Sequence, residues 1–350
     1  MSVSLTSPDN YIRYLDAEDH FRNGLLRLMD LERSEFERWI ELAERHRSGD
    51  LLADLRAGWR ELRPPPSSIA PVDGPVDRGP RAMSGRVWHA AIAERPTHGV
   101  AVSDEESSAW LVRWESERFV FEQQPPAYEE SYFEGDKVSA GGYGDYAAQS
   151  GWRHEKAARQ VRELGAATGL THGRVLDIGS GYGLFRAALR NAGYEDEGVE
   201  VSAFARSKAL SSYGLETHAG ALEEHCEEWA ERFDAVTLFD LIEHLANPDA
   251  LMDQVAAILR PGGFVGVKTP NIDCPEADVF GPHYHSLKRE HLCLFSPTSL
   301  TAMARRAGLD PVDLQTVSHL LVGFVGADQT AAWQRELKGA DIVAWYQRRA

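Results

Sequence analysis

Three glycines spaced two apart, Gly179, Gly181 and Gly183, stand in the segment RVLDIGSGYGLF at residues 174–185. A short apolar run precedes them and a helical pattern follows. Because glycine lacks a Cβ atom, such a loop can turn tightly, adopt positive φ and bring its backbone N–H groups close to a ligand. Asp177 precedes the loop at the carboxyl end of the strand, where ligands of open α/β sheets bind. The segment predicts a nucleotide-type cofactor site at a strand-to-helix turn.

The spacing of these glycines disfavours a nicotinamide cofactor. Leu184 follows Gly183, so the final glycine of the dinucleotide fingerprint G-x-G-x-x-G is missing. A second predicted strand ends at Glu200, which lies 200 − 177 = 23 residues after Asp177. An acidic residue at this place can accept hydrogen bonds from both hydroxyls of a ribose. Glu200 is therefore the predicted ribose ligand, and a strand end without a ligand is the alternative.

Strand and helix patterns alternate regularly from residue 154 onward. Such alternation predicts an α/β fold in which helices cover both faces of a parallel sheet. The predicted strands span residues 174–178, 195–200, 215–218, 234–239, 264–269 and 311–317. The predicted helices span residues 154–168, 183–192, 203–212, 247–259 and 297–307.

Four motifs follow one another along the chain: VLDIGSGYG, GVEVS, FDAVTLFDLIEHLANP and LRPGGFVGVKTPN. With them, residues 143–311 resemble class I S-adenosylmethionine-dependent methyltransferases, in particular the bacterial branch with ubiquinone-type O-methyltransferases and natural-product tailoring enzymes. The resemblance implies a doubly wound, mostly parallel seven-stranded sheet (a Rossmann-like fold) with S-adenosyl-L-methionine as cofactor. The last strand of this family is antiparallel. Residues 320–327 are the candidate for it, and residues 328–348 are the predicted final helix.

The resemblance also implies which residues bind the cofactor. Asp177 and the glycine loop hold the methionine part, Glu200 holds the ribose, and the region from Gly220 to Glu223 meets the adenine. Many relatives place an aspartate in that region, where this chain has Ala221. Tyr143 and Tyr146 precede the loop and are interpreted as closing over the cofactor, with ordinary packing as the alternative. The full predicted set is Tyr143, Tyr146, Asp177, Gly179, Ser180, Gly181, Gly183, Glu200, Val201, Ala221, Leu222, Phe239 and Asp240.

The segment FDLIEHL supplies the candidate catalytic residues. Asp240, Glu243 and His244 are spaced i, i+3 and i+4 and share one face if the segment is helical. An imidazole has an unperturbed pKa of about 6.5 and can take a proton near neutral pH, so His244 is a candidate general base. His291 follows the fifth strand and is the second candidate, with Glu243 beside them as a third catalytic residue. Packing or local hydrogen bonding is the alternative role for both histidines.

The same residues form a possible metal site. Two carboxylates and two imidazoles, from Asp240, Glu243, His244 and His291, could bind Mg²⁺, Mn²⁺ or another divalent ion. Related patterns with glutamate in place of Asp240 bind a metal in small-RNA 2′-O-methyltransferases and in some ubiquinone O-methyltransferases. A bound metal would lower the pKa of an acceptor hydroxyl and orient it. A metal-dependent O-methyltransferase is therefore one alternative hypothesis.

The chain divides into four predicted segments. Residues 1–63 form an N-terminal helical module, because apolar residues recur there at helical spacing from residue 16. Residues 64–82 are rich in proline and glycine and are predicted to be a linker. Residues 83–127 are predicted to be a small β-rich module, in which Trp110, Trp114, Phe119 and Phe121 fill a local core, and residues 128–350 are predicted to be the methyltransferase domain.

Charge and composition restrict the partners. The formal net charge of −17 repels phosphate backbones and disfavours nucleic acid, so a small-molecule methyl acceptor is the expected partner. The three cysteines lack metal or disulfide spacing, which favours the reducing cytoplasm. No export signal or membrane-spanning run is evident, so no membrane partner is expected. The apolar stripe of the N-terminal helices packs internally or forms a homodimer face.

These features together predict a methyltransferase that acts on oxygen or nitrogen of a small molecule in a biosynthetic or tailoring pathway. His244 or His291 is the predicted general base. The alternative from another class is a noncatalytic S-adenosylmethionine-binding protein, since a fold does not determine a reaction. A nicotinamide-dependent reductase is a further alternative.

Overall fold

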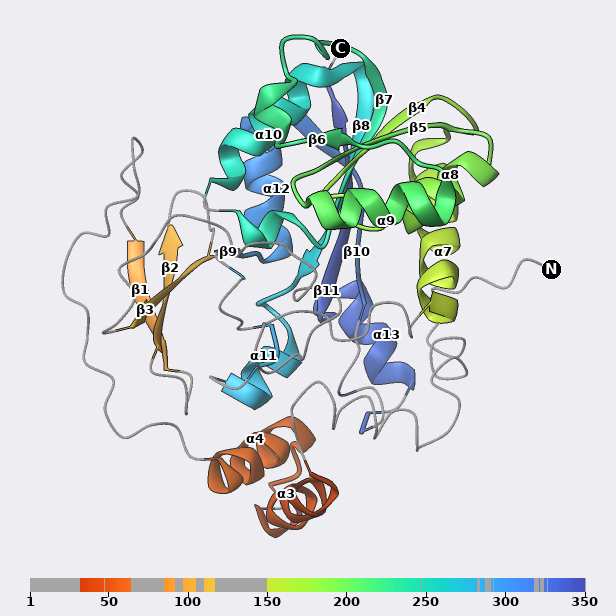
Figure 1. Ribbon diagram of the computed structural model, residues 1–350. Helices are drawn as coiled ribbons and strands as arrows, with labels where there is room; N and C mark the ends of the chain where they lie inside the picture. Colours follow the sequence, from red (N-terminus) through yellow and green to blue (C-terminus); the bar gives the residue numbers. More distant parts are fainter. Residues whose placement is uncertain are drawn as a thin grey trace. The chain divides into compact units, whose positions relative to one another are not determined.

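The computed structural model describes residues 32–46, 48–63, 85–91, 97–104, 110–116, 150–245, 247–281, 284–286, 291, 293–317, 321, 324–325 and 327–349. The chain forms two compact units (Figure 1). The first unit comprises residues 1–121, 270–299 and 315–342, and the second comprises residues 122–269, 300–314 and 343–350. Residues 270–299 and 315–342 thus belong to the same unit as residues 1–121.

A seven-stranded sheet organises the second unit. Its strand order is β10-β11-β8-β7-β4-β5-β6. Strand β4 pairs in parallel with β5 and β7, β5 with β6, and β7 with β8. The strands are β4 (Arg174–Ile178), β5 (Glu195–Glu200), β6 (His218–Ala219), β7 (Phe233–Phe239), β8 (Leu259–Pro270), β10 (Leu309–Val317) and β11 (Asp341–Arg348).

Helices cover both faces of this sheet, as the alternating sequence pattern predicts. Figure 1 shows α8 and α9 on one side of the sheet and α10 and α12 on the other. The apolar side chains of α7 and α8 form a buried cluster with those of β4, β7 and β11, among them Leu164, Leu189, Val175, Ala235 and Trp345. The helices are α7 (Ser150–Thr168), α8 (Leu184–Asn191), α9 (Ala203–Tyr213), α10 (Pro248–Ile258) and α12 (Pro297–Arg306). The predicted doubly wound α/β fold is confirmed.

The predicted positions of the last strand and the last helix, at residues 320–327 and 328–348, are wrong. The described residues of 320–327 are not in a strand: Leu321 and Phe324 belong to a turn in which Phe324 N donates to Leu321 O at 2.9 Å. The predicted helix over 328–348 is replaced by α13 (Ala327–Arg335) followed by strand β11.

Strand β11 still has the antiparallel direction that the family predicts. Gln347, near its end, donates to the carbonyl of Gly262 near the start of β8. The carbonyl of Ala340, just before β11, accepts from the backbone N–H of Asn271, just after β8. The two strands therefore run in opposite directions.

The first unit is built around two tryptophans. The helices α3 (Arg33–His46) and α4 (Leu51–Leu62) carry Trp39 and Trp59, which are 0% and 1% exposed. The indole of Trp59 packs edge-on against Trp39, with 5.4 Å between ring centroids, and against Phe280 of α11 (Pro275–Phe280), at 5.0 Å. Each indole N–H is satisfied by a carbonyl, that of Leu55 for Trp39 and that of Phe280 for Trp59. Helices α3 and α4 thus bury apolar side chains inside the unit, whereas the part of the predicted helical module before residue 32 lies outside the described residues.

A four-stranded antiparallel sheet completes the first unit, with strand order β1-β2-β3-β9. Its strands are β1 (Gly85–Ala91), β2 (Thr97–Asp104), β3 (Trp110–Ser116) and β9 (Cys293–Leu294). Three of them lie where the sequence predicts a small β-rich region. The fourth comes from a distant part of the chain. The structure describes the backbone of Trp110 and Trp114 but not their side chains, and Phe119 and Phe121 lie outside the described residues. The predicted core role of these four residues therefore stays a prediction.

Among the helices that the structure describes, none is both long enough and apolar enough to cross a bilayer.

Candidate functional site

The glycine loop turns between β4 and α8, as predicted. Gly179, Gly181 and Gly183 have φ values of 71°, 51° and 79°, a region that residues with a Cβ rarely adopt. The backbone N–H of Gly179 donates to the carbonyl of Val199 in the neighbouring strand at 2.9 Å. The loop is therefore fixed to the carboxyl edge of the sheet, between β4 and β5.

Gly183 is also required by packing. A Cβ atom at this position would lie 2.7 Å from Cδ1 of Leu215 and 3.2 Å from Cβ of Ala209. The end of the loop thus contacts the segment that leads into β6.

Replacing Gly183 with alanine should cost more stability than the same change at Gly214, which has a similar φ of +64° but open space around a Cβ. Left-handed backbone alone costs about 1–2 kcal/mol, and the overpacking at Gly183 adds about 1–3 kcal/mol. Urea unfolding of the two variants separates these contributions. Equal losses of unfolding free energy would contradict the close packing at Gly183.

Asp177 lies buried at the end of β4, with 5% of its surface exposed. The hydroxyl of Thr237 donates to its Oδ1 at 2.6 Å. Burial raises the pKa of Asp177 to about 7, although the Thr237 hydrogen bond and the charge of Arg186 oppose this shift. Because the folded state favours the protonated carboxyl, this group's contribution to stability is lost as the pH rises from about 4 towards 7. A cationic ligand beside Asp177 would favour its ionised form.

Glu200 ends strand β5 next to the loop and is 7% exposed. Its Oε2 accepts from the backbone N–H of Gly181 at 2.9 Å, and its Oε1 accepts from that of Ser202 at 2.8 Å. Burial raises the pKa of this carboxyl, and the two backbone hydrogen bonds oppose the rise. These bonds fix the orientation of both oxygens. A carboxylate oxygen has two lone pairs, so each can accept a second hydrogen bond from a ligand.

Two further residues fit a bound nucleoside. The hydroxyl of Ser180, within the glycine loop, is buried and has no hydrogen-bond partner among the residues that the structure describes. Buried polar atoms without a partner are rare and often mark a ligand contact. Val201, directly after Glu200, exposes 51% of its surface and offers an apolar contact for a planar base. The residues of this region therefore fit the cofactor that the sequence predicts.

The predicted adenine region follows β6. Ala221 precedes the short 3₁₀ helix η1 (Leu222–Glu224), and its backbone N–H donates to Oε1 of Glu224 at 2.9 Å. Leu222 is 2% exposed, whereas Glu223 lies at the surface. Glu224 thus caps the turn, and the adenine contact expected of this region stays a prediction.

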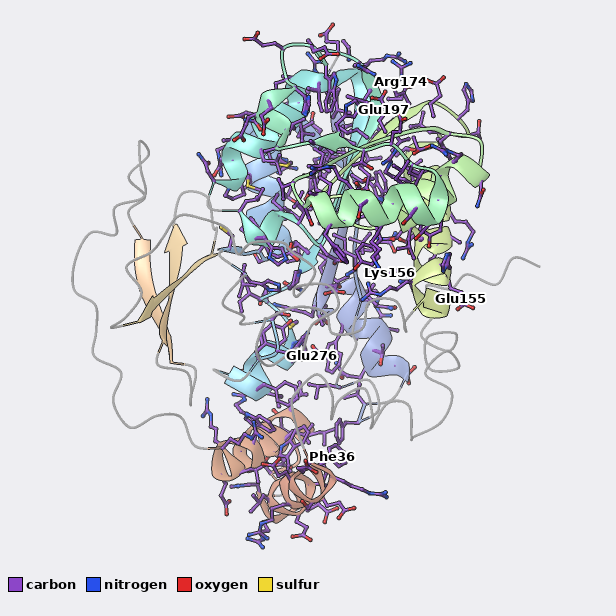
Figure 2. The ribbon with its side chains drawn as sticks, in the orientation of Figure 1. Phe36, Glu155, Lys156, Arg174, Glu197 and Glu276 are labelled. Carbon is purple, nitrogen blue, oxygen red and sulfur yellow. The ribbon has the colours of Figure 1, made fainter. Side chains whose placement is uncertain are left out.

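Asp240 has surroundings that the sequence analysis missed. Its φ is +55°, and the helical turn η2 (Ile242–His244) begins only after it, so Asp240 does not share a helical face with Glu243 and His244. The ammonium group of Lys156 lies 2.7 Å from Oδ2, and that of Lys268 lies 2.8 Å from Oδ1. Figure 2 shows Lys156 on α7. Both oxygens of Asp240 are therefore in ion pairs with lysine side chains.

Glu243 is buried, and the hydroxyl of Thr269 donates to its Oε2 at 2.9 Å. Burial raises the pKa of Glu243 to about 8, and the negative charge of Asp240 adds to the rise. His244 is 9% exposed, and its backbone N–H donates to the carbonyl of Leu241. Both residues follow the carboxyl end of β7, on the predicted cofactor edge of the sheet.

His291 belongs to the first unit. Its Nδ1 lies 2.8 Å from the carbonyl oxygen of Ser286. A carbonyl can only accept, so Nδ1 carries the proton and Nε2 is the basic nitrogen. The predicted metal site of Asp240, Glu243, His244 and His291 stays a prediction, as do the catalytic roles of Glu243, His244 and His291.

The remaining predicted residues divide into two groups. Phe239 ends β7, and its ring lies 5.1 Å from that of Phe185 and 6.2 Å from that of Trp345, so it packs in the core of the second unit. Tyr143 and Tyr146 lie outside the described residues.

Comparisons with known proteins agree with this geometry. A family model for a methyltransferase domain matches residues 150–314. Ubiquinone biosynthesis O-methyltransferases of Bordetella avium and Aromatoleum aromaticum are 32% and 30% identical to this chain over 176 and 178 residues. These alignments cover 45% and 47% of this chain and 70% and 76% of the two relatives.

Solved structures also resemble the chain. A 1,6-didemethyltoxoflavin-N1-methyltransferase of Burkholderia thailandensis, solved with its substrate and S-adenosylhomocysteine, is 17% identical, with a TM-score of 0.45. That alignment covers 75% of this chain and 99% of the other. An S-adenosylmethionine-dependent methyltransferase of Archaeoglobus fulgidus is 16% identical, with a TM-score of 0.44 and coverage of 56% and 94%.

Proposed function

The chain belongs to the class I S-adenosylmethionine-dependent methyltransferases, and from this we propose that it methylates an oxygen or nitrogen atom of a small molecule. Its relatives are named ubiquinone biosynthesis O-methyltransferases, which supports an oxygen acceptor in a biosynthetic or tailoring pathway. The net charge of −17 supports a small molecule in preference to nucleic acid.

The observation that carries this proposal is the arrangement of Glu200 beside the glycine loop. Its carboxylate is buried and held by Gly181 and Ser202, so its position is set before a ligand binds. A fixed acceptor pair suits the vicinal hydroxyls of a ribose. The orphaned hydroxyl of Ser180 adds a polar contact in the same loop.

When bound, S-adenosylmethionine would supply a methyl group activated by its sulfonium, for an in-line transfer in which the acceptor forms a bond to the methyl carbon and S-adenosylhomocysteine is the leaving group. The protein's own residues then have two tasks, to hold the reactants in contact and to remove a proton from the acceptor. Asp177 and the glycine loop would hold the methionine end of the donor. Ionised Asp177 would pair with a cationic group there, which offsets the cost of its burial.

We assign the proton acceptor to His244 or His291. His244 lies near the end of β7, where the family places its methyl acceptor, and His291 presents Nε2 as its basic nitrogen. Glu243 is less suited to act as a base near neutral pH, because its raised pKa of about 8 keeps it protonated there. Separate replacement of the two histidines by glutamine, with turnover and donor binding both measured, identifies the base.

Methyl transfer itself tests the proposal. We expect purified protein with methyl-labelled S-adenosylmethionine to label a compound in the protein-free, low-molecular-weight fraction of a cell extract. We expect no label in protein or RNA fractions. Calorimetry with S-adenosylhomocysteine is the accompanying binding test, and dialysis against EDTA followed by added Mg²⁺ tests metal dependence. Absence of S-adenosylhomocysteine binding by the folded protein would refute the proposal, and binding without any transfer would favour the noncatalytic alternative.

A further inference from the structure

Arg186 is a buried charge that the proposed reaction does not use. It lies in the first turns of α8, directly after the glycine loop, and only 2% of its surface is exposed. A guanidinium group removed from water costs free energy unless its partners compensate. The hydrogen-bond partners of Arg186 therefore indicate its structural role.

The guanidinium group joins three segments of the second unit. Its Nε donates to Oδ1 of Asp196 in β5 at 3.1 Å. Its Nη1 donates to the hydroxyl of Thr217 at 2.7 Å, and its Nη2 donates to the carbonyl of Glu216 at 2.9 Å. Arg186 thus connects α8 and β5 to the residues that lead into β6.

Strand β5 is shaped to admit this side chain. A Cβ atom at Gly198 would lie 2.6 Å from Cδ of Arg186 and 2.8 Å from its Nη1. The absence of a side chain at Gly198 therefore provides the path along which Arg186 reaches the next strand.

Arg186 anchors the two residues directly before strand β6, Glu216 and Thr217. Leu215 precedes them and is fully buried against Gly183.

Strand β6 itself has two exposed residues, His218 and Ala219, and pairs with β5 at the edge of the sheet. Nε2 of His218 lies 3.3 Å from Oε2 of Glu197, and the carbonyl of Ala219 accepts from Nε2 of His225 at 2.9 Å. Arg186 thus shares with these contacts the task of holding residues 216–219.

We propose that Arg186 is a positioning residue for donor binding, which holds residues 216–219 so that the following turn at residues 220–223 receives the adenine. The inference rests on the proposed function, because it takes S-adenosylmethionine as the donor. It extends that function to a residue that would not touch the ligand. Because the turn at residues 220–223 would contact the adenine, loss of Arg186 should weaken the binding of the adenosine half of the donor and leave the contacts of its amino-acid half unchanged.

The test compares two ligands that share the adenosine half. S-adenosylhomocysteine has the amino-acid end, and 5′-methylthioadenosine lacks it. Calorimetry should show that Arg186→Met weakens both ligands by the same factor of roughly ten or more, the loss typical of a charged hydrogen bond. Arg186→Lys should recover part of the affinity, because lysine keeps the charge but not the fork of donors.

Two further variants separate positioning from stability. Thr217→Val keeps the shape of the side chain, removes one partner of Arg186, and should weaken both ligands about threefold with little change in melting temperature. This variant decides the question if Arg186→Met does not fold. Arg190→Met is the matched control, since Arg190 also pairs with Asp196, at 2.8 Å, but is half exposed. Its affinities should stay within about twofold of the unmodified protein.

The outcomes distinguish a failure of the positioning role of Arg186 from a failure of the proposed function. If the unmodified protein binds both ligands and the folded Arg186→Met and Thr217→Val variants bind them equally well, the positioning role is overturned and the proposed function stands. A loss confined to S-adenosylhomocysteine also overturns it. If the unmodified protein binds neither ligand, the proposed function itself fails.

Discussion

Glu200→Ala should weaken the binding of S-adenosylhomocysteine by about a hundredfold or more. Two hydrogen bonds from ribose hydroxyls to a carboxylate contribute about 1.5–3 kcal/mol each, and a factor of ten corresponds to about 1.4 kcal/mol. The change also removes the acceptor for the backbone N–H groups of Gly181 and Ser202, so the loop loses its fixed orientation. Calorimetry gives the dissociation constant, and turnover at subsaturating donor should fall in parallel.

Glu195→Ala provides the matched control for this prediction. Glu195 is the first residue of the same strand, β5, and its side chain is 70% exposed at the opposite end. It pairs with Arg174 at the surface, an interaction that contributes about 0–1 kcal/mol to stability. Equal affinity losses for the two variants would show that Glu200 has no special role in binding the donor.

Trp59→Ala should lower the free energy of unfolding of the first unit by about 3–5 kcal/mol, as expected for removal of a buried tryptophan. The indole is 1% exposed and contacts both Trp39 and Phe280 edge-on. Its loss opens a large cavity and leaves the carbonyl of Phe280 without its indole donor. Urea unfolding followed by circular dichroism measures the change, with attention to separate transitions for the two units.

Two companion variants dissect this effect. Trp59→Phe keeps an aromatic ring but removes the N–H, and should cost less than alanine. Leu51→Ala lies on the same helix at a residue that is 44% exposed, and should change the unfolding free energy by about 0.5 kcal/mol or less. A small effect of Trp59→Ala, similar to that of Leu51→Ala, would contradict the central place of Trp59 in this cluster.

Strands β4 and β5 could be predicted because the residues at their carboxyl ends mark where each strand stops. The predicted spans 174–178 and 195–200 match β4 and β5 residue for residue. Strand β4 is an apolar run that ends at the glycine loop, whereas β5 is mostly acidic and is marked by Val199 and Glu200 at its carboxyl end. Strand β6 was displaced from 215–218 to His218–Ala219, because burial of Leu215 does not distinguish a strand from the loop before it.

The predictions for residues 320–348 were wrong because a short apolar run does not show which element it packs against or pairs with. Leu321 is buried in the tryptophan cluster of the first unit, and Phe324 and Val325 pack against that cluster. Strand β11 carries polar residues at both ends, and Ala344, Trp345 and Tyr346 are buried in succession at its centre. Such a pattern lacks the alternation that marks a strand with one exposed face.

Site residues that lie close to a recognisable motif in the sequence could be predicted. Site residues that only the fold brings together were missed. Asp177 and Glu200 follow from the loop and the strand ends. Lys268 could have been found, because the parallel pairing of β7 and β8 sets it opposite Phe239, next to Asp240. Lys156 and Arg186 reach their partners from helices, and no spacing in the sequence signals these contacts.

The interleaving of the two units has a consequence for synthesis and for protein engineering. Since the units alternate over six stretches of sequence, the chain passes between them five times. During translation the helix pair α3–α4 is made before Phe280 and Trp333, which pack against it and follow more than two hundred residues later. The pair therefore stays incompletely covered until these residues have been synthesised. A graft of this accessory unit onto another enzyme of the family must transfer several separate stretches at once, so recombination at one junction cannot exchange it.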